Sequence, residues 1–404
     1  MGFNPRVIHL NSVDQVRQQL ARIQVDPCGI DLMAPKALLE TVLLEKVPCG
    51  AANILKQEML TLGGDAAVAR GTVTCSVEHT DILLMATRKQ LDQLISRLHR
   101  QPFGLKGLAA ELKRLREISL RPAQVLTGKK CSLDVTRPQV MGIINVTPDS
   151  FFDGGTCHDL DATLRQAEQQ VKEGVDLFDV GGESTRPGAA LVSLELELER
   201  VVPVVKALKR AFDLPVSVDT NKAAVADAVL CDGADFINDI SGLTFDPEMA
   251  DVIARQGAGV FVMHTRGRPD EMQRDTHYHD LICEVMAGLQ QSVELAHNAG
   301  IAAASISVDP GIGFGKSVAG NLEILRRLDD VAALGYPVLI GTSRKSFIGQ
   351  VLDQPQPQQR LIGSVASVAV AAQNGAQIFR VHDVAETRLA VDLAWAIRHD
   401  DNRA

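Results

Sequence analysis

From Gln139 onward the chain alternates short apolar runs with amphipathic stretches, and this alternation restricts the fold more than any other feature. The eight apolar runs lie at 139–146, 175–182, 215–220, 235–240, 259–264, 305–311, 337–343 and 377–382. Helical patterns lie between them, for example at 160–173, 195–212, 281–299 and 321–334. Runs that are apolar at nearly every position are typical of strands buried on both faces. About eight strand–helix units in roughly 265 residues predict a (β/α)8 TIM barrel, with a doubly wound open sheet as the alternative.

Polar side chains gather where these runs end. The groups are, in order, Asn145, Asp179, Glu183, Asp219, Asn238, Asp239, His264, Asp309, Ser343, Arg344, Lys345, Arg380 and His382. One aspartate at a strand end usually caps a helix, but capping does not explain the same bias at eight strand ends. Because the carboxyl ends of barrel strands converge on one face, we predict that these groups ring a single pocket.

Several members of this ring favour a site for an anion. Arg380 and His382 are two residues apart on a strand, so both side chains project from the same face. Arginine offers a planar donor fork for phosphate oxygens, and the amide oxygen of Asn145 is a suitable ligand for Mg²⁺. With Arg186 and Lys345 as further cations, the pattern predicts a polyphosphate site that uses magnesium. The alternative is that Arg380 and His382 only pair with neighbouring carboxylates.

A second set combines Asp219, Asn238, Asp309 and Lys345 at the ends of other strands. Two carboxylates, an amide and an ammonium can read the donors and acceptors of a flat polar heterocycle, and they favour a positive charge that develops on it. The glycine-rich loop after Asp309 lets backbone approach such a ligand, and Phe314 in that loop supplies an apolar wall. Paired aspartates also act as acid and base in glycosidases, but the amide and the lysine favour ring recognition.

Composition limits the class of protein. The 404 residues carry a formal net charge of -9, so we expect no nucleic-acid partner. The seven cysteines are scattered and never form a CxxC pair, which fits a reducing cytoplasm rather than a disulfide framework. We expect no membrane association, because no apolar run approaches membrane-spanning length and the N-terminus lacks a leader pattern.

Residues 1–130 are predicted to form a separate α+β domain of unknown role, ahead of a catalytic barrel at 131–404. Its expected helices lie at 13–23, 35–45, 52–62, 89–99 and 108–118, its expected strands at 73–77 and 82–86, and a short apolar run at 7–10 precedes the first helix. Residues 127–138, which contain TGKK and TRP, are predicted to be the linker. The fold class is therefore α/β, with a TIM barrel preceded by a smaller α+β domain.

Several long blocks of residues 138–395 resemble the dihydropteroate synthase family of pterin-binding TIM barrels. The blocks are MGIINVTPDSFFDGG (141–155), DVGGESTRPGA (179–189), VSVDT (216–220), FINDISG (236–242), DPGIGFGK (309–316), GTSRKS (341–346) and FRVHDV (379–384). The resemblance implies a transferase of folate biosynthesis. Such an enzyme condenses 6-hydroxymethyl-7,8-dihydropterin pyrophosphate with 4-aminobenzoate to give 7,8-dihydropteroate and pyrophosphate.

The resemblance also implies roles for individual residues. Asp219, Asn238, Asp309 and Lys345 would hold the pterin, while Asn145 with Mg²⁺, Arg380 and His382 would hold the pyrophosphate. One mobile loop would carry Asp149, Phe151 and Asp153, and a second would carry Thr185 and Arg186. Ser346 would meet the aminobenzoate carboxylate. The catalytic set would be Asp149, Asp153, Thr185, Arg186 and Lys345, with Phe314 beside the substrate.

Departures from the family pattern are Phe152, Thr265 and Arg266. Two rival functions are a corrinoid-linked methyltransferase of the same group and a catalytically inactive homologue that binds pterin or a protein. The pyrophosphate cluster favours the synthase over the first rival, and the complete set of matched polar residues favours it over the second. The resemblance further implies a homodimer.

Overall fold

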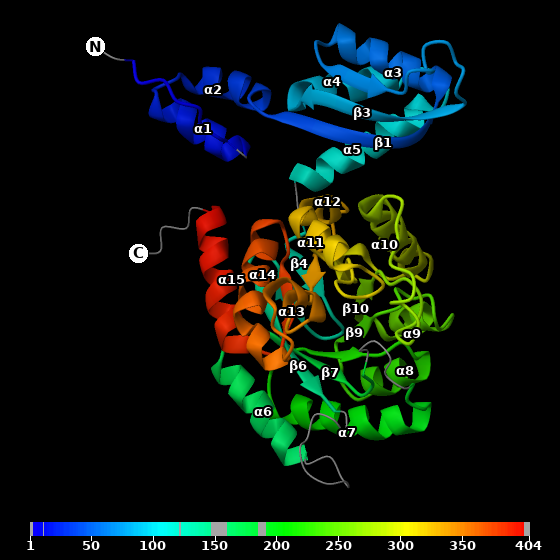
Figure 1. Cartoon of the computed structure of the whole chain (residues 1–404), viewed down its shortest axis with the longest axis vertical. Helices are drawn as coiled ribbons and strands as arrows, with labels where there is room; N and C mark the ends of the chain where they lie inside the picture. The colour runs from blue at the N-terminus through cyan, green and yellow to red at the C-terminus, as the bar shows by residue number, and fades with distance from the viewer. Residues whose placement is uncertain (1–2, 11, 121–122, 147–159, 185–190, 400–404) are drawn as a thin grey trace. The chain divides into compact units, whose positions relative to one another are not determined.

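The computed structural model describes residues 3–10, 12–120, 123–146, 160–184 and 191–399 (Figure 1). The chain divides into two compact units, 1–120 and 121–404. The boundary predicted after Lys130 lies instead after Leu120, because residues such as Leu126 and Leu133 pack with the barrel.

The first unit contains helices and a small antiparallel sheet. Its elements are α1 (Val13–Arg22), α2 (Pro27–Met33), a 3-10 turn (Ala34–Lys36), β1 (Leu39–Pro48), α3 (Cys49–Thr61), β2 (Asp65–Val68), β3 (His79–Thr87), α4 (Arg88–Leu98) and α5 (Leu105–Leu120). The strand order is β1-β3-β2, and β3 is antiparallel to both neighbours. Strand β1, helix α3 and strand β2 therefore form a split β-α-β unit into which β3 inserts.

The core of the first unit follows from the alternation of side chains along β3. Ile82, Leu84 and Ala86 are buried, and they pack against Leu55 of α3 and Leu94 of α4. Helix α4 begins with a capping box, in which the side chains of Thr87 and Gln90 each bond the other's backbone. The unit therefore has its own hydrophobic core, as the predicted α+β domain requires.

Two predictions for the first unit are wrong. Residues 39–48 form strand β1 rather than part of a helix at 35–45, because they pair with β3 from Leu39–Thr87 to Leu44–Ile82. Residues 73–77 are a turn and bend, with Val73 71% exposed and Cys75 at φ 49.

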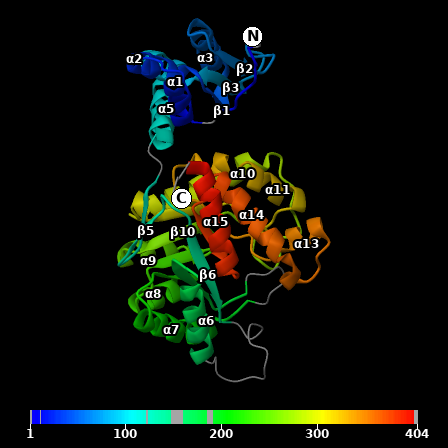
Figure 2. The same cartoon turned by 90° about the vertical axis from the view of Figure 1, so that its left-hand side faces the viewer.

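The second unit is a parallel barrel surrounded by helices (Figure 2). Its strands are β6 (Gln139–Asn145), β7 (Leu177–Gly181), β8 (Val216–Asp219), β9 (Phe236–Asp239), β10 (Gly259–Met263), β11 (Ile306–Asp309), β12 (Leu339–Ile340) and β13 (Ile378–Val381). All eight coincide with the predicted apolar runs. The sheet order is β11-β10-β9-β8-β7-β6-β13-β12, and a parallel bridge between Val308 and Val338 joins its two ends. The predicted TIM barrel is therefore confirmed.

Helices follow the strands and cover the barrel. They are α6 (Leu160–Lys172), α7 (Leu194–Ala211), α8 (Ala223–Cys231), α9 (Met249–Gln256), α10 (Leu281–Asn298), α11 (Val318–Arg326), α12 (Leu328–Ala332), α13 (Ser346–Leu352), α14 (Leu361–Gln373) and α15 (Val384–His399). The main core lies between strands and helices, where outward strand residues such as Val218 and Val260 meet helix residues such as Val229 and Leu289. Among the described residues, no helix has both the length and the apolar character needed to cross a bilayer.

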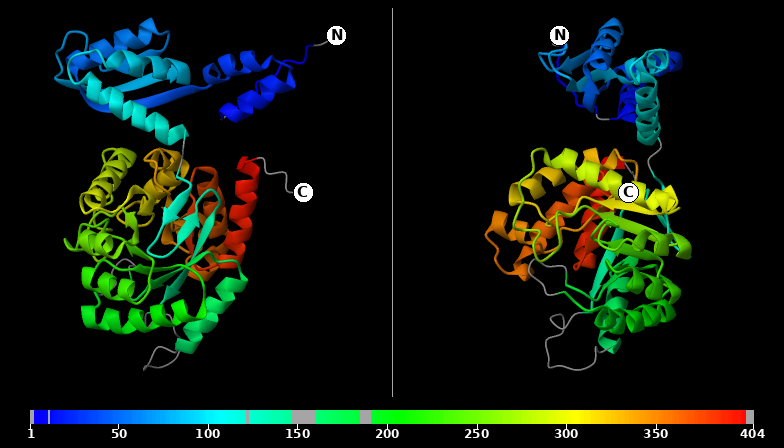
Figure 3. Two further views of the ribbon diagram at one scale, coloured as in Figure 1. Left: turned by 180° about the vertical axis from the view of Figure 1, so that it is seen from behind. Right: turned by 90° about the vertical axis from the view of Figure 1, so that its right-hand side faces the viewer.

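An antiparallel hairpin of β4 (Val125–Thr127) and β5 (Ser132–Asp134) belongs to the second unit, and Figure 3 shows it in cyan beside the barrel. Leu126 and Leu133 are buried against Phe236 and Phe261, which point into the barrel with ring centroids 5.4 Å apart. The predicted linker at 127–138 is therefore wrong. Its apolar residues close one end of the barrel interior, so they belong to the barrel's core.

Candidate active site

Five polar side chains project inward from the carboxyl ends of five barrel strands. Asp179, Asp219, Asn238, Asp309 and Arg380 each occupy a position that alternates with an outward apolar residue. The four acidic and amide residues among them are buried. Strand alternation thus brings together the groups that the sequence placed in one pocket.

Arg380 links two of the carboxylates across the barrel. Its Nε donates to Asp179 Oδ2 at 2.5 Å, and its Nη2 donates to Asp219 Oδ2 at 2.8 Å. Asn238 Nδ2 donates to the same Asp179 oxygen at 3.2 Å. The alternative considered for Arg380, pairing with neighbouring carboxylates, therefore describes this structure. Two of its five N–H donors are used here, which leaves three for a ligand.

Asp179 was noted at a strand end in the sequence but was not assigned to the substrate site. Its carboxylate is fully buried, and Oδ1 has no hydrogen-bond partner among the described residues. Asp179 therefore orients both Arg380 and Asn238 while keeping one acceptor unused. The signal that could have found it is the need of a buried arginine for a buried carboxylate.

Burial shifts the pKa values of the charged residues in this site. Desolvation raises the pKa of Asp219 to about 7, although Arg380 opposes the shift and the charge of Asp179 adds to it. Desolvation also raises the pKa of Asp309, against the charge of Lys345. Desolvation lowers the pKa of Lys345 to about 8, although Asp309 opposes this change. Such shifts are typical of groups whose charges await a ligand.

Lys345 lies against the loop that follows Asp309. Its Nζ donates to the carbonyl oxygen of Ile312 and lies 4.7 Å from the centroid of the Phe314 ring. Phe314 is 9% exposed and packs with Met263 and other apolar residues. The loop thus supplies the apolar wall that the sequence predicted, next to the ammonium group.

The backbone conformation of Gly311 shows why this loop needs glycine. Its φ is +70°, and an added Cβ would lie 2.0 Å from the carbonyl oxygen of His264. The amide of Gly311 donates to Asp309 Oδ1 at 2.7 Å, which fixes the aspartate side chain. A residue with a side chain would disturb this contact, so glycine is required by geometry.

His382 and Ser346 lie at neighbouring strand ends. His382 Nδ1 lies 3.0 Å from Ser343 Oγ, and the backbone amide of His382 donates to the same oxygen at 3.2 Å. Ser346 is exposed at the first position of α13. Arg344, which precedes this helix, has φ 57 and pairs with Asp383. This left-handed residue sets the direction in which the following Lys345 projects.

Asn145 is the predicted metal ligand. It is half-buried at the end of β6, and its Oδ1 lies 3.7 Å from where a Cβ of Gly181 would be. The described residues contain no group of three or more His, Cys, Asp or Glu side chains that could hold a metal ion. One neutral oxygen fits Mg²⁺ that is bound mainly by substrate oxygens and water, and it does not fit a metal held by the protein alone.

Lys316 is buried under the loop that follows Asp309. Its Nζ lies 3.1 Å from His264 Nδ1 and donates to the carbonyl oxygens of Phe314 at 2.9 Å and His264 at 3.3 Å. Desolvation lowers the pKa of Lys316 to about 7, and that of His264 to about 3. Three acceptors satisfy the ammonium, so Lys316 supports the loop from within.

The predicted catalytic residues Asp149, Asp153, Thr185 and Arg186 lie outside the described residues. Among the described residues nearest to the last two is Glu183. This residue accepts from the amide of Val192 at 3.1 Å and pairs with Lys222 at 2.5 Å. Lys222 also pairs with Glu197, which is fully buried.

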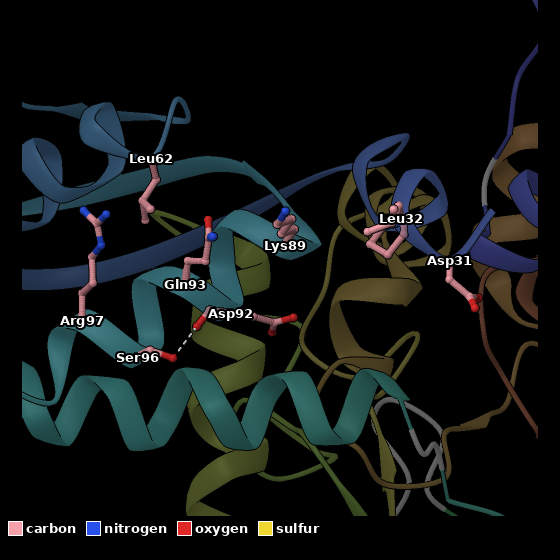
Figure 4. Close-up of a pocket in the computed structure, with 9 residues that line it drawn as sticks. Asp31, Leu32, Leu62, Lys89, Asp92, Gln93, Ser96 and Arg97 are labelled. Atoms are coloured by element: carbon pink, nitrogen blue, oxygen red, sulfur yellow. Dashed lines mark hydrogen bonds between the residues drawn. The ribbon is translucent and has the colours of Figure 1, made fainter. Parts of the chain in front are cut away.

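A hollow of about 570 Å³ lies in the first unit (Figure 4). Its lining residues are Asp31, Leu32, Pro35, Leu62, Lys89, Asp92, Gln93, Ser96 and Arg97. Three of its charged groups already have ion-pair partners: Asp31 has Arg17, Asp92 has Arg116 and Arg97 has Glu58. These pairings leave little charge for a ligand, so the barrel remains the candidate active site.

Comparison with known proteins agrees with this geometry. The profile of a family described as "Pterin binding enzyme" matches residues 141–382. The probable bifunctional folylpolyglutamate synthase/dihydropteroate synthase of Haloferax volcanii is 42% identical over 403 residues, which cover 97% of this chain and 47% of that protein. The chain thus spans about half the length of that relative. The dihydropteroate synthase of Synechocystis sp. is 47% identical over 262 residues, which cover 64% of this chain and 91% of that protein.

A solved structure gives the same result for the fold. The dihydropteroate synthase of Xanthomonas albilineans with 4-aminobenzoic acid superposes with a TM-score of 0.65 at 43% identity. The match covers 69% of this chain and 99% of that one. The similarity to this structure and to the Synechocystis enzyme amounts to about two thirds of the chain, whereas the Haloferax relative covers nearly all of it.

Proposed function

The chain belongs to the pterin-binding enzyme family, its second unit is a dihydropteroate synthase barrel, and we propose that it condenses a pterin pyrophosphate with 4-aminobenzoate. The substrate is 6-hydroxymethyl-7,8-dihydropterin pyrophosphate. The C–O bond between its methylene carbon and the pyrophosphate breaks, and a C–N bond to the amine forms. The products are 7,8-dihydropteroate and pyrophosphate, and the amine loses a proton.

One observation carries this proposal: Asp219, Asn238, Asp309 and Lys345 come from four different strand ends and enclose one buried polar site. A pterin ring has N–H donors on one edge and nitrogen and oxygen acceptors on the other. The two carboxylates accept from the donors, while the amide and the ammonium complete the pattern. The ring face packs beside Phe314.

The pyrophosphate is proposed to lie toward Asn145, Arg380 and His382. Arg380 keeps three N–H donors after its bonds to Asp179 and Asp219, and these can reach phosphate oxygens. Mg²⁺, when bound, neutralises charge on the leaving oxygens, and Asn145 would supply it with one oxygen ligand. Departure leaves positive charge delocalised into the pterin, which Asp219 and Asp309 stabilise from within the barrel.

The amine is proposed to approach from the side of α13. Ser346 is exposed there and would bond the aminobenzoate carboxylate, and a similar protein is known with 4-aminobenzoic acid bound. A weakly basic aromatic amine needs no strong general base to attack a delocalised cation. By resemblance, Asp149, Asp153, Thr185 and Arg186 belong to the loops that exclude water during this step.

The test is release of pyrophosphate by the full chain with the pterin pyrophosphate, Mg²⁺ and 4-aminobenzoate, repeated with Lys345→Ala. The matched control is Lys172→Ala, an exposed lysine of α6 paired with Glu168. Release that depends on the amine and falls at least about 100-fold in the Lys345 variant alone supports the proposal. Tight pterin binding without release would contradict it, and would favour a methyltransferase or a binding protein.

A homodimer is also proposed. Leu389, Leu393 and Ile397 follow one another at intervals of four on α15 and are 64–74% exposed. Ile362 and Val370 of the adjacent α14 are 82% and 48% exposed. A continuous apolar stripe of this kind is typical of a subunit interface. Leu393→Glu would shift the mass in solution toward the monomer, and an unchanged mass would rule this stripe out.

A cytoplasmic location is proposed on the cysteines. The described cysteines are all free thiols, including exposed Cys28 and Cys231. Free thiols persist in reducing compartments such as the cytoplasm. Cell fractionation tests this location.

A further inference from the structure

Two cysteines of the first unit lie in direct contact although they are distant in sequence. Cys49 Sγ lies 2.7 Å from Cys75 Sγ, across a sequence separation of 26 residues. Cys49 begins α3, and Cys75 lies in the connection between β2 and β3. A disulfide bond is about 2.0 Å long, so a small approach of the two sulfurs is enough to join them.

The surroundings hold both sulfurs in this arrangement. Cys49 Sγ also lies 2.8 Å from the carbonyl oxygen of Thr72, and Asn53 Nδ2 donates to the same oxygen at 2.9 Å. The same Asn53 nitrogen lies 3.8 Å from Cys49 Sγ and 3.7 Å from Cys75 Sγ. The first turn of α3 therefore bonds to the connection that carries Cys75.

The two cysteines differ in exposure and in backbone strain. Cys49 is 6% exposed, whereas Cys75 is exposed and has φ 49, in the left-handed region that disfavours a side chain. Non-glycine residues persist in this region where the surroundings impose it, often at functional positions. In this conformation the Cys75 thiol lies against Cys49, and Cys75 remains exposed to a dissolved oxidant.

We propose that Cys49 and Cys75 form a redox-responsive pair, which a hydroperoxide converts to an intramolecular disulfide. The exposed Cys75 thiolate attacks the peroxide oxygen, giving a sulfenic acid and one molecule of water once a proton is taken up. The Cys49 sulfur then attacks the Cys75 sulfur and displaces the second molecule of water, using the thiol proton of Cys49. Two thiols and one hydrogen peroxide thus give one disulfide and two waters.

The Cys49 thiol donates to Cys75 Sγ, so its sulfur lies beside the sulfur that it attacks, and the proton that it gives up completes the second molecule of water. The disulfide would tie the 69–78 connection to the start of α3. It would therefore restrict a segment that now ends in an exposed turn. No other described cysteine pair shows this contact.

The experiment treats the reduced full chain with hydrogen peroxide, alkylates the remaining thiols and maps tryptic peptides without reduction. We expect peptides 47–56 and 71–88 to be linked and about 2 Da lighter than their sum, and dithiothreitol to separate them. The link should form roughly tenfold faster than oxidation of Cys28, an exposed cysteine of the same unit.

Variants decide between outcomes. Cys28→Ser should keep the link, and Cys75→Ser should abolish it while Cys49 remains open to alkylation after unfolding. Sulfinic or sulfonic acid at Cys75 with Cys49 still reduced would overturn the proposal. Links between separate chains would also overturn it. Far-UV circular dichroism of Cys75→Ser checks that loss of the link does not result from loss of the fold.

Discussion

Asp179 offers the sharpest test of how the barrel interior is organised. Its carboxylate is fully buried and accepts hydrogen bonds from Arg380 and Asn238 through one oxygen. The change Asp179→Asn keeps the shape of the side chain but removes the charge. Arg380 would then keep only Asp219 as a counterion, and the amide group of the new side chain would face another N–H donor.

The expected size of the effect follows from the bonds lost. A hydrogen bond to a charged group contributes about 1.5–3 kcal/mol, which corresponds to a loss of about 10- to 150-fold in kcat/KM. A second effect has a definite sign, because the charge of Asp179 raises the pKa of Asp219. Removing that charge lowers the pKa of Asp219, so the acidic fall in kcat/KM should move to lower pH.

The assay is pyrophosphate release across a pH series, with Asp176→Asn as the matched control. Asp176 precedes β7 and pairs with Arg388 at 2.8 Å, but its side chain is 30% exposed and faces away from the site. The control should lose about 1 kcal/mol of unfolding free energy without a change in kcat/KM. If Asp179→Asn stays within twofold of the parent in kcat/KM, the proposed support of Arg380 and Asn238 is refuted.

Three further predictions concern the same site. The pH profile of kcat/KM for the parent should be bell-shaped, falling below a pH of about 7 as Asp219 is protonated and above about 8 as Lys345 loses its proton. The change Lys345→Arg should extend the alkaline side of the profile, and an unchanged profile in this variant would contradict the assignment. Chelation by EDTA should abolish turnover, and Asn145→Ala should raise the Mg²⁺ concentration for half-maximal activity about tenfold. If the parent and the variant need the same Mg²⁺ concentration, Asn145 is not a metal ligand. Gly311→Ala should lower the free energy of unfolding by about 3 kcal/mol, because both its positive φ and its backbone neighbour oppose a side chain. Gly300→Ala, with φ +96 and no neighbour within 4 Å, should lose only about 1 kcal/mol, and urea unfolding that ranks the two equally would refute the steric argument.

The barrel could be predicted from the sequence because its strands are buried on both faces. Strands such as β8 and β9 are buried at every position and end in a polar group, so burial and the position of the polar residues both indicate a barrel strand. The first unit was harder. Residues 39–48 carry Leu43 and Leu44 at neighbouring positions, a pattern that suits a helix as well as a strand, and only pairing with β3 decides between them.

The membership of the candidate site could be predicted, but its pairing could not. Strand-end position placed Asp219, Asn238 and Asp309 inside one pocket, because topology alone brings these positions together. Which carboxylates pair with Arg380 depends on distances across the barrel, and these distances cannot be predicted from the sequence. The same holds for Lys316, whose three acceptors are two carbonyl oxygens and a histidine nitrogen that the fold brings together.

Burial and the charges of the barrel interior together explain why the pKa values of its ionisable side chains depart from their usual range. Asp179, Asp219 and Asp309 face two cations, Arg380 and Lys345, in a site with little water to screen them. One negative charge is in excess when all five are ionised. Desolvation is the main cause of the raised pKa of Asp219, and the charge of Asp179 adds to it, so the ionised carboxylate is costly in this site. A ligand that donates hydrogen bonds to Asp219 and Asp309, and then gains positive charge as its leaving group departs, lowers this cost most at the moment of bond breaking. The ionised carboxylates of Asp219 and Asp309 are therefore stabilised most by the cation that forms as the leaving group departs, so the site is complementary to the transition state of the proposed reaction.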